Sequence, residues 1–174
     1  EAVKRKEDYR VLTGAGNYTD DINLANQRVA VFVRSPHAHA NIKGINLAKA
    51  EAMPGVTKIF TGKAVEGKMG GLPCGWLITS TNGEPMKEPP HPILADGKVR
   101  YVGDHVAMVV ADTLEQAKNA AEAVQVDYVA LPAVIDMRTA RNGPALHDEA
   151  PDNHCYKWTL GDKAAVDAAF AGAA

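Results

Sequence analysis

The sequence has 174 residues and a formal net charge of −2, from 19 Lys and Arg against 21 Asp and Glu. That length is enough for one domain with a real core, and the balanced charge, without a run of basic residues, argues against a nucleic-acid partner. The longest apolar run, residues 106–111, is too short to span a bilayer. Cys74 and Cys155 lie far apart and outside any CxxC pattern, so we expect free thiols and a cytoplasmic protein.

The first third of the chain is typical of a polar lead-in followed by short strands. Residues 1–19 form the lead-in, with turns expected at Gly14 and Gly16. β-branched and aromatic residues then indicate strands, which Pro and Gly interrupt. The elements predicted up to residue 62 are a nearly buried strand over 28–35, a strand over 40–47, a helix over 47–53 that Asn46 caps, and a strand over 56–62.

The stretch from Lys63 to Pro92 has no periodicity and accumulates Gly and Pro. Such a long irregular segment in a small domain is usually functional or docks on a partner, and its prolines remove the backbone donors of a regular ladder. It still carries more apolar bulk than a solvated linker. Its large apolar residues are Met69, Leu72, Trp76, Leu77, Ile78 and Met86. We therefore expect this loop to bury apolar side chains against another surface.

The second half of the chain alternates strands and helices again. It begins with a predicted hairpin of strands 98–103 and 105–112 that turns at Gly103-Asp104. A helix follows, capped by Asp112 with Glu115 or by Thr113 with Gln116, and packing through Leu114, Ala117, Ala121 and Val124. The remaining elements are a strand over 124–131, a helix over 135–141, and a final helix that Asp162 caps and that buries Val166, Ala169, Phe170 and Ala173. This order predicts an α+β fold of small mixed sheets with packed helices, rather than a doubly wound sheet.

Residues 146–155 (LHDEAPDNHC) gather metal-ligating and acid–base side chains in one short stretch. His147, His154 and Cys155 lack the short fixed spacing of zinc ligands, and nearby prolines break any helix that would align them. The carboxylates are interpreted as solvated turn formers: Asp148, Glu149 and Asp152. A polar loop is the simpler interpretation.

Other histidines give equally weak signals. His37 and His39 would share one face of a strand and could bind a metal there, but no third ligand is near in sequence. His105 could act as a base oriented by Asp104, although Gly-Asp is ordinary turn chemistry. We expect no tight metal site at His37, His39, His147, His154 or Cys155.

Neither the remaining cysteine nor the N-terminal glycines form a reactive centre by sequence. Cys74, in GLPCGW, has no basic residue closer than Lys68 that would favour a reactive thiolate. Residues 13–18 (TGAGNY) lack the Gly spacing of a phosphate loop. We therefore assign no catalytic, cofactor-binding or metal-binding residue to this chain.

Six phrases, taken in order, are similar to a known family. They are EDYRVLTGAGNYTDDINL, VRSPHAHANIKGIN, MPGVTKIFTG, KVRYVGDHVAMVVADT, VQVDYVALPAVID and LHDEAPDN. Together they resemble the beginning of the large subunit of molybdenum hydroxylases, the family of xanthine dehydrogenase, aldehyde oxidase and aerobic carbon monoxide dehydrogenase. Two positions depart from the family pattern: His105 stands where Pro is usual, and Val129 where an acidic residue is usual. Neither position has a catalytic role in the family.

The resemblance implies a fold and a domain plan. Residues 20–140 would form the family's N-terminal α/β hammerhead domain, after the lead-in of residues 1–19. Residues 141–174 would form a connector and helix that lead to molybdenum-binding domains absent from this sequence, which accounts for the polar loop at 146–155. Because the chain begins at Glu1 rather than Met and ends inside a predicted helix, we expect it to be part of a longer protein.

The resemblance also implies cofactors and partners for the complete enzyme. Its large subunit would hold molybdenum in molybdopterin, as the cytosine dinucleotide, with [2Fe-2S] clusters and FAD on partner subunits. The assembly would be a homodimer of heterotrimers. The family's glutamate base and its cofactor-binding segments match no position of this sequence, so none is carried over.

The leading hypothesis is a structural and assembly domain of the molybdopterin-binding large subunit of an oxidoreductase, carbon monoxide dehydrogenase-like or xanthine dehydrogenase-like, and inactive as an isolated fragment. One alternative is a stand-alone binding module that uses the 63–92 loop. Another is a small metal-dependent enzyme that uses the histidines. Under the leading hypothesis, the loop around Trp76 should be mobile or partly exposed in this fragment and ordered in the complete enzyme.

Overall fold

Two antiparallel sheets of three strands each carry the fold within residues 3 and 5–173, the part of the chain that the computed structural model describes. Residues 1, 2 and 4 of the predicted lead-in, and residue 174 of the predicted connector, lie outside the described residues. The strands are β1 (Val29–Arg34), β2 (Ala40–Asn46), β3 (Val56–Thr61), β4 (Lys98–Val99), β5 (His105–Ala111) and β6 (Gln125–Ala130). The helices are α1 (Asp8–Leu12), α2 (Ala48–Glu51), α3 (Gly62–Val65), α4 (Leu114–Ala123) and α5 (Lys163–Ala171), with 3-10 turns η1 (Thr19–Asp21) and η2 (Ala140–Asn142).

β5 is the central strand of the first sheet, whose order is β1-β5-β3. Val109 lies opposite Val31 of β1 on one side and opposite Ile59 of β3 on the other. The fully buried residues of β5 are Val106, Ala107, Val109 and Ala111. Because other elements cover this strand on both faces, its sequence is nearly continuous in apolar residues instead of alternating. β1 does alternate: it is an edge strand with every second residue exposed, so the prediction that it is nearly buried is wrong.

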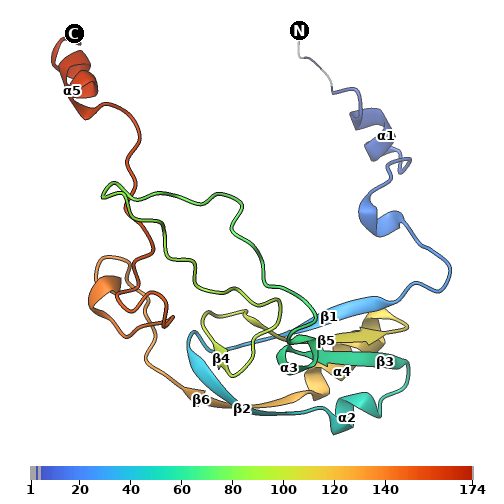
Figure 1. The fold of residues 1–174 in the computed structure, drawn as a ribbon. Coiled ribbons are helices and arrows are strands. Elements are labelled where there is room, and N and C mark those ends of the chain that lie inside the picture. Colours follow the sequence, from blue (N-terminus) through green and yellow to red (C-terminus); the bar gives the residue numbers. More distant parts are fainter. Residues whose placement is uncertain (1–2, 4, 174) are drawn as a thin grey trace.

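α4 packs across the first sheet, beside α2 (Figure 1). The Thr113 hydroxyl accepts the Gln116 N–H at 3.2 Å, and the Gln116 side-chain oxygen accepts the Thr113 N–H at 3.1 Å, which confirms the second of the two predicted capping boxes. Ala117 and Ala120 are fully buried, and their small size lets the helix approach the sheet closely. Leu114, predicted to pack inward, is half exposed at the start of the helix, whereas Ala120, which was not predicted to pack inward, is fully buried.

The second sheet has the order β4-β2-β6 and shares a small core with the first. β2 pairs with β6 along its length, from Ala40 opposite Ala130 to Asn46 opposite Gln125, whereas β4 adds only two residues. The cluster between the sheets consists of Ala40, Ala95, Val99 and Val106. Since Val106 belongs to β5, this cluster ties the two sheets together. The predicted α+β class is confirmed.

The predicted hairpin of residues 98–103 and 105–112 is wrong. β4 pairs with β2, whereas β5 pairs with β1 and β3, so the two strands belong to different sheets. The chain does turn at Gly103 and Asp104, but the backbone there pairs with Ser35. The Ser35 N–H donates to the Asp104 carbonyl and the Gly103 N–H donates to the Ser35 carbonyl, both at 2.8 Å. The turn therefore prolongs the β1–β5 pairing and leaves β4 to β2.

The two ends of the chain stand away from the sheets, with α1 at one end and α5 at the other (Figure 1). Asp162 caps α5 as predicted, because its carboxylate accepts the Ala165 N–H at 3.0 Å. The predicted burial of one face is wrong, since every described residue of this helix is exposed. The residues concerned are Val166, Ala169, Phe170 and Ala173. A helix that lies apart from both sheets has no surface of this chain to cover that face.

Two local predictions fail for reasons of turn chemistry. The helix expected over 135–141 is replaced by a turn and the short η2, because the Asp136 carboxylate accepts the Arg138 N–H at 2.9 Å and competes with helical bonding. In the lead-in, Gly14 adopts a left-handed φ of 73° in a turn, as predicted, but Gly16 lies in extended chain outside any turn.

No helix of the described chain is long and apolar enough to cross a membrane.

Most of the 63–92 loop lacks regular structure, but residues 78–87, here called the strap, fold into a short hairpin. The Ser80 N–H donates to the Glu84 carbonyl at 2.8 Å, and the Met86 N–H donates to the Ile78 carbonyl at 2.9 Å. Gly83 at the tip has a φ of 85°, a conformation that glycine adopts without strain. The expectation that prolines bar any ladder in this loop is therefore wrong for the strap.

Candidate functional site

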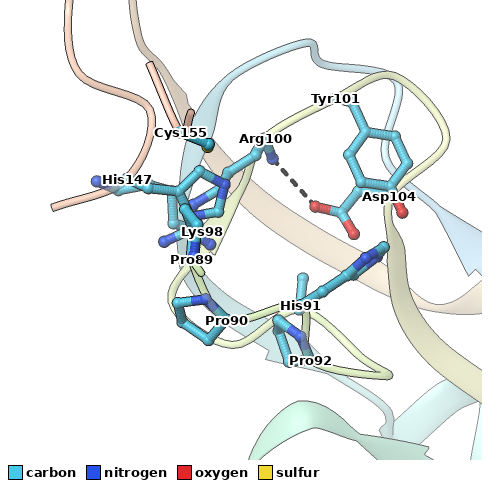
Figure 2. A pocket seen from close by; sticks show the side chains of 11 residues that line it. Pro89, Pro90, His91, Pro92, Lys98, Arg100, Tyr101, Asp104, His147 and Cys155 are labelled. Atoms are coloured by element: carbon cyan, nitrogen blue, oxygen red, sulfur yellow. Dashed lines mark hydrogen bonds between the residues drawn. The ribbon is translucent and has the colours of Figure 1, made fainter. Parts of the chain in front are cut away.

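A cavity of about 370 Å³ lies where three segments of the chain meet (Figure 2). One wall is the proline-rich end of the 63–92 loop, from Pro89 to Pro92. A second wall is the chain between Lys98 and Asp104, which links β4 to β5. The connector supplies His147 and Cys155. Figure 2 shows Lys98 and Arg100 grouped with the two connector residues, and Asp104 with Tyr101 on the other side.

Lys98 and Arg100 give the cavity its positive charge. Strand β4 places Lys98 opposite Asn41 of β2, and the chain then carries Arg100 into the turn. The Arg100 Nε–H donates to the Leu146 carbonyl at 2.9 Å, which fixes the guanidinium against the connector. Among the described residues neither cation has a carboxylate partner.

Asp104 is the one carboxylate of the cavity and is almost completely buried, at 8% exposure. Its side chain accepts the Arg100 backbone N–H at 3.0 Å, which closes the turn between β4 and β5 (Figure 2). Partial burial, followed by the neighbouring Asp104 carboxylate, raises the pKa of Tyr101. The phenol is therefore neutral at pH 7.

The two histidines of the cavity differ in their surroundings. Burial, followed by the charge of Arg100, lowers the pKa of His147, so its ring is neutral at pH 7. Its Nδ1 atom is buried and has no hydrogen-bond partner within the described chain. The ring of His91 packs edge-on against Tyr101, with centroids 6.3 Å apart.

The stretch 146–155 is an ordered turn that one side chain organises. Asn153 accepts the Leu146 N–H at 2.9 Å and donates to the carbonyls of Ala140 and Pro144, also at 2.9 Å each. Asp148 and Glu149 are exposed, as expected for turn formers. These contacts place the polar loop firmly beside Arg100.

The strap packs on the connector through backbone and charged contacts. The Lys87 N–H donates to the Cys155 carbonyl at 2.9 Å, and the Thr81 N–H donates to the Lys157 carbonyl at 2.9 Å. The Asp152 carboxylate lies 2.9 Å from the Lys87 ammonium and 3.4 Å from the Arg141 guanidinium. The hydrogen bond from Lys87 is the main cause that lowers the pKa of Asp152 to about 2. Asp152 is thus an ion-pair partner, and its interpretation as a merely solvated residue is wrong.

The histidines considered as metal ligands lie in separate places. His39 is buried between β1 and β2, and its Nδ1 pairs with the Pro132 carbonyl at 2.8 Å. His37 packs against the ring of Tyr128, at 4.9 Å between centroids. Within residues 3 and 5–173, no three His, Cys, Asp or Glu side chains meet in a geometry that would hold a metal ion.

Two further candidates have local structural roles. His105 opens β5 and stacks on Phe32 of β1, with centroids 4.4 Å apart, so its ring has a packing role there. Burial, followed by the charge of Arg34, lowers the pKa of His105. Cys74 is exposed, and its thiol donates to the Trp76 carbonyl at 3.2 Å.

Inspection of the sequence missed the cavity because its walls are distant along the chain. The residues that it overlooked as site residues are Pro89, His91, Lys98, Arg100 and Tyr101. One signal was present: three prolines around His91 form a stiff wall that holds its shape without a hydrogen-bond ladder. Nothing in the sequence shows that Arg100 reaches Leu146, a contact across 46 positions.

Comparison with known proteins decides the family. The sequence model described as "Aldehyde oxidase and xanthine dehydrogenase, a/b hammerhead domain" matches residues 13–132, well over half of the chain. The chain belongs to this family. The hammerhead fold that the sequence phrases implied is thereby confirmed, together with the assignment to the xanthine dehydrogenase and aldehyde oxidase group.

Relatives of this hammerhead domain are much longer proteins. The large subunit of nicotine 6-hydroxylase from Paenarthrobacter nicotinovorans is 38% identical over 98% of this chain, which spans 20% of that relative. The large chain of carbon monoxide dehydrogenase from Afipia carboxidovorans is 36% identical over 98% of this chain and 22% of its own. A crystal structure of the Cu,Mo-CO dehydrogenase aligns with a TM-score of 0.75 and 35% identity, over 98% of this chain and 22% of that one. The chain thus spans about a fifth of these relatives.

The molybdenum–molybdopterin group that the family implies does not fit the described residues. Phosphate-bearing cofactors commonly use free amides at a helix N-terminus. Here the Thr113 hydroxyl already occupies the first turn of α4, and the Asp162 carboxylate occupies that of α5. The cavity has a single bare arginine and lysine and no helix N-terminus among its lining residues, so it lacks such amides as well. No oxidation step is therefore assigned to residues of this chain.

Proposed function

We propose that this hammerhead domain is the N-terminal structural and assembly part of the molybdopterin-binding large subunit of a molybdenum hydroxylase, an oxidoreductase of the carbon monoxide dehydrogenase or xanthine dehydrogenase type. The observation that carries the proposal is the family match over residues 13–132. The names of the relatives support it, since they include a hydroxylase large subunit and a Cu,Mo enzyme. The proposal names no substrate. The nicotine 6-hydroxylase large subunit and the carbon monoxide dehydrogenase large chain act in different enzymes, and their identities to this chain, 38% and 36%, are nearly equal.

The proposed domain plan follows the resemblance. Residues 20–140 are the hammerhead, residues 1–19 its lead-in, and residues 141–174 a connector and helix toward molybdenum-binding domains. In the complete enzyme those domains hold the molybdopterin cytosine dinucleotide. Iron–sulfur and FAD subunits complete a homodimer of heterotrimers in the cytoplasm. The isolated fragment has no catalytic, cofactor-binding or metal-binding residue and is inactive.

Exposed apolar side chains support the assembly role. Single exposed apolar residues are normal on any protein, but here they gather on the segments that extend from the two sheets. Examples are Leu12 of α1, Phe170 of α5, and Trp76 of the loop, which are 85%, 78% and 68% exposed. Burying them against further domains would remove apolar area from water and stabilise the assembly.

Metal and flavin content tests this function. We expect the purified 174-residue chain to contain no stoichiometric molybdenum, iron or flavin and to oxidise no substrate, whereas the chain lengthened by its downstream coding sequence should bind molybdenum. Elemental analysis and absorption spectra measure both. Stoichiometric molybdenum in the 174-residue chain would overturn the proposal, and so would a coding sequence without molybdopterin-binding domains downstream.

A free-standing binding module that uses the 63–92 loop is the second candidate, and the cavity beside Pro89–Pro92 favours it. The two functions differ in what they require. In a free-standing module the loop would be ordered without a partner. In an assembly domain the amides around Trp76 would be protected from hydrogen exchange only after other domains bind. The small metal-dependent enzyme has no comparable observation in its favour.

A further inference from the structure

The assembly role proposed above does not use the cavity that the Pro89–Pro92 wall, the Lys98–Asp104 segment, His147 and Cys155 enclose. The cavity joins features of a small-molecule site: a concave shape, a volume of about 370 Å³, apolar walls and a few charged groups. We propose that it binds a small monocarboxylic acid with a flat apolar body. This inference does not depend on the proposed function, because it uses only residues of this chain.

The carboxylate would bind at the basic end of the cavity. Arg100 is fixed through its Nε–H to Leu146, so its terminal NH₂ groups remain for a ligand, and arginine binds carboxylates in a two-pronged geometry. Lys98 lines the same end, as Figure 2 shows, and adds a second positive charge without a carboxylate partner among the described residues. The buried, unpartnered Nδ1 of His147 provides another polar atom there.

The body of the ligand would lie against prolines and rings. Pro89, Pro90 and Pro92 form one apolar wall, and the edge-on pair of His91 and Tyr101 borders it. Flat ring systems pack well on such surfaces. The prolines have little conformational freedom to lose, so ordering this wall on binding costs little entropy.

Asp104 limits the net charge of the cavity. Its carboxylate is buried on the side opposite Lys98 and Arg100. Two cations against one anion leave a net charge of about +1, which favours an anion over a neutral molecule of the same shape. Phosphate has no apolar body to pack against the prolines, so it should bind more weakly than an aromatic carboxylate.

Amide NMR of the 174-residue chain tests the site, with benzoate, benzamide and inorganic phosphate as probes. Benzoate should give saturable shifts at Lys98–Tyr101 and at His147. Benzamide has the same shape without the charge and should bind about tenfold more weakly or worse, since charge-assisted hydrogen bonds are the stronger ones. Phosphate should bind more weakly than benzoate at these amides. Equal binding of benzamide, or phosphate binding as tight as that of benzoate, would overturn the proposal.

Three variants make the test specific. Lys98→Gln should weaken benzoate binding about tenfold. Arg100→Lys keeps the charge but loses the anchored fork and should also bind more weakly. Lys58→Gln, at an exposed position of β3 outside the cavity, is the matched control and should bind like the parent chain. The shifts of β5 amides report whether each variant keeps the fold. Unchanged affinity in both cavity variants would refute the site without bearing on molybdenum content.

Discussion

Asn153 shapes the connector with a single amide side chain. It satisfies one N–H and two carbonyls, those of Leu146, Ala140 and Pro144. Its backbone adopts a φ of 52°, a left-handed conformation that Asn tolerates better than most residues with a Cβ. The turn that presents His147 to the cavity thus depends on one residue that fits both the bonding and the backbone.

Replacing this residue separates the two contributions. Asn153→Gly keeps the backbone conformation and loses the hydrogen bonds, each worth about 1 kcal/mol net, whereas Asn153→Ala also adds backbone strain of about 1 kcal/mol. Amide exchange at Leu146 should be faster in both variants, and fastest in Asn153→Ala. Exchange at Val109 in the core is the internal control. Equal protection of Leu146 in all three chains would show that the bonds do not hold the turn.

Asp152 makes the contact between strap and connector sensitive to acid. Its pKa is lowered from 3.8 to about 2, mainly by the hydrogen bond from Lys87. A lowered pKa means that the ion pair favours the folded contact at every pH above 3.8, and that this contribution is lost as the pH falls toward 2. The Lys87 amide donates to the Cys155 carbonyl. Its protection against hydrogen exchange should therefore decrease as the pH falls from 3.8 to about 2.

Asp152→Asn is the matched variant for that experiment. It cannot ionise, so its Lys87 amide should show no extra loss of protection in this pH window beyond the change in intrinsic exchange. High salt should weaken the effect in the parent chain, since the Asp152 side chain is 40% exposed. An identical pH profile in both chains would contradict the assignment.

At the scale of elements, the capping box of α4 is the clearest local determinant. Thr113→Ala removes the hydroxyl that accepts the Gln116 N–H, and should lower the free energy of unfolding by about 1 kcal/mol. Thr113→Ser keeps the acceptor and should stay near the parent value. Urea unfolding measures both. If Ser destabilises as much as Ala, the threonine methyl group and not the cap is what matters.

Sequence patterns predicted elements well where the cause is local. Thr113 and Gln116 are three residues apart and specify their helix start, and the β-branched runs around Val31 and Val109 specify strands. They failed where distant residues compete. The backbone of Ser35 forms hydrogen bonds with the backbones of Gly103 and Asp104. Strand β5 therefore pairs with β1 and not with β4. No local pattern records such a choice.

The cavity escaped prediction for the same reason. Its charged end depends on the contact of Arg100 with the Leu146 carbonyl, and its apolar wall comes from a loop that looked irregular. The family resemblance did not reveal the cavity either. The functional residues known for the family match no position of this sequence. Tertiary contacts between segments far apart in the chain form the cavity, and local composition does not record them.

At the scale of the whole molecule, a packed unit can be distinguished from segments that extend away from it. The sheets with α2 and α4 form a packed unit, while α1, α5 and the 63–92 loop extend from it (Figure 1). The strap is bound to the connector of the same chain, so part of the loop needs no partner. The segment around Trp76 differs: the Trp76 ring packs edge-to-face with Trp158, with ring centroids 5.6 Å apart, and the residue is still 68% exposed.

This difference divides the loop in an exchange experiment. In the 174-residue chain, the amides of Met86 and Lys87 should be protected, since they donate to carbonyls in the strap and the connector, while residues 74–77 should exchange rapidly. In the complete assembled enzyme, residues 74–77 should become protected as Trp76 and its apolar neighbours are buried, because backbone amides exchange slowly only where opening is costly. Val109 should be protected in both forms and sets the scale. If residues 74–77 were equally protected in the isolated chain, the loop would pack on its own domain, and the docking role proposed for it would be wrong.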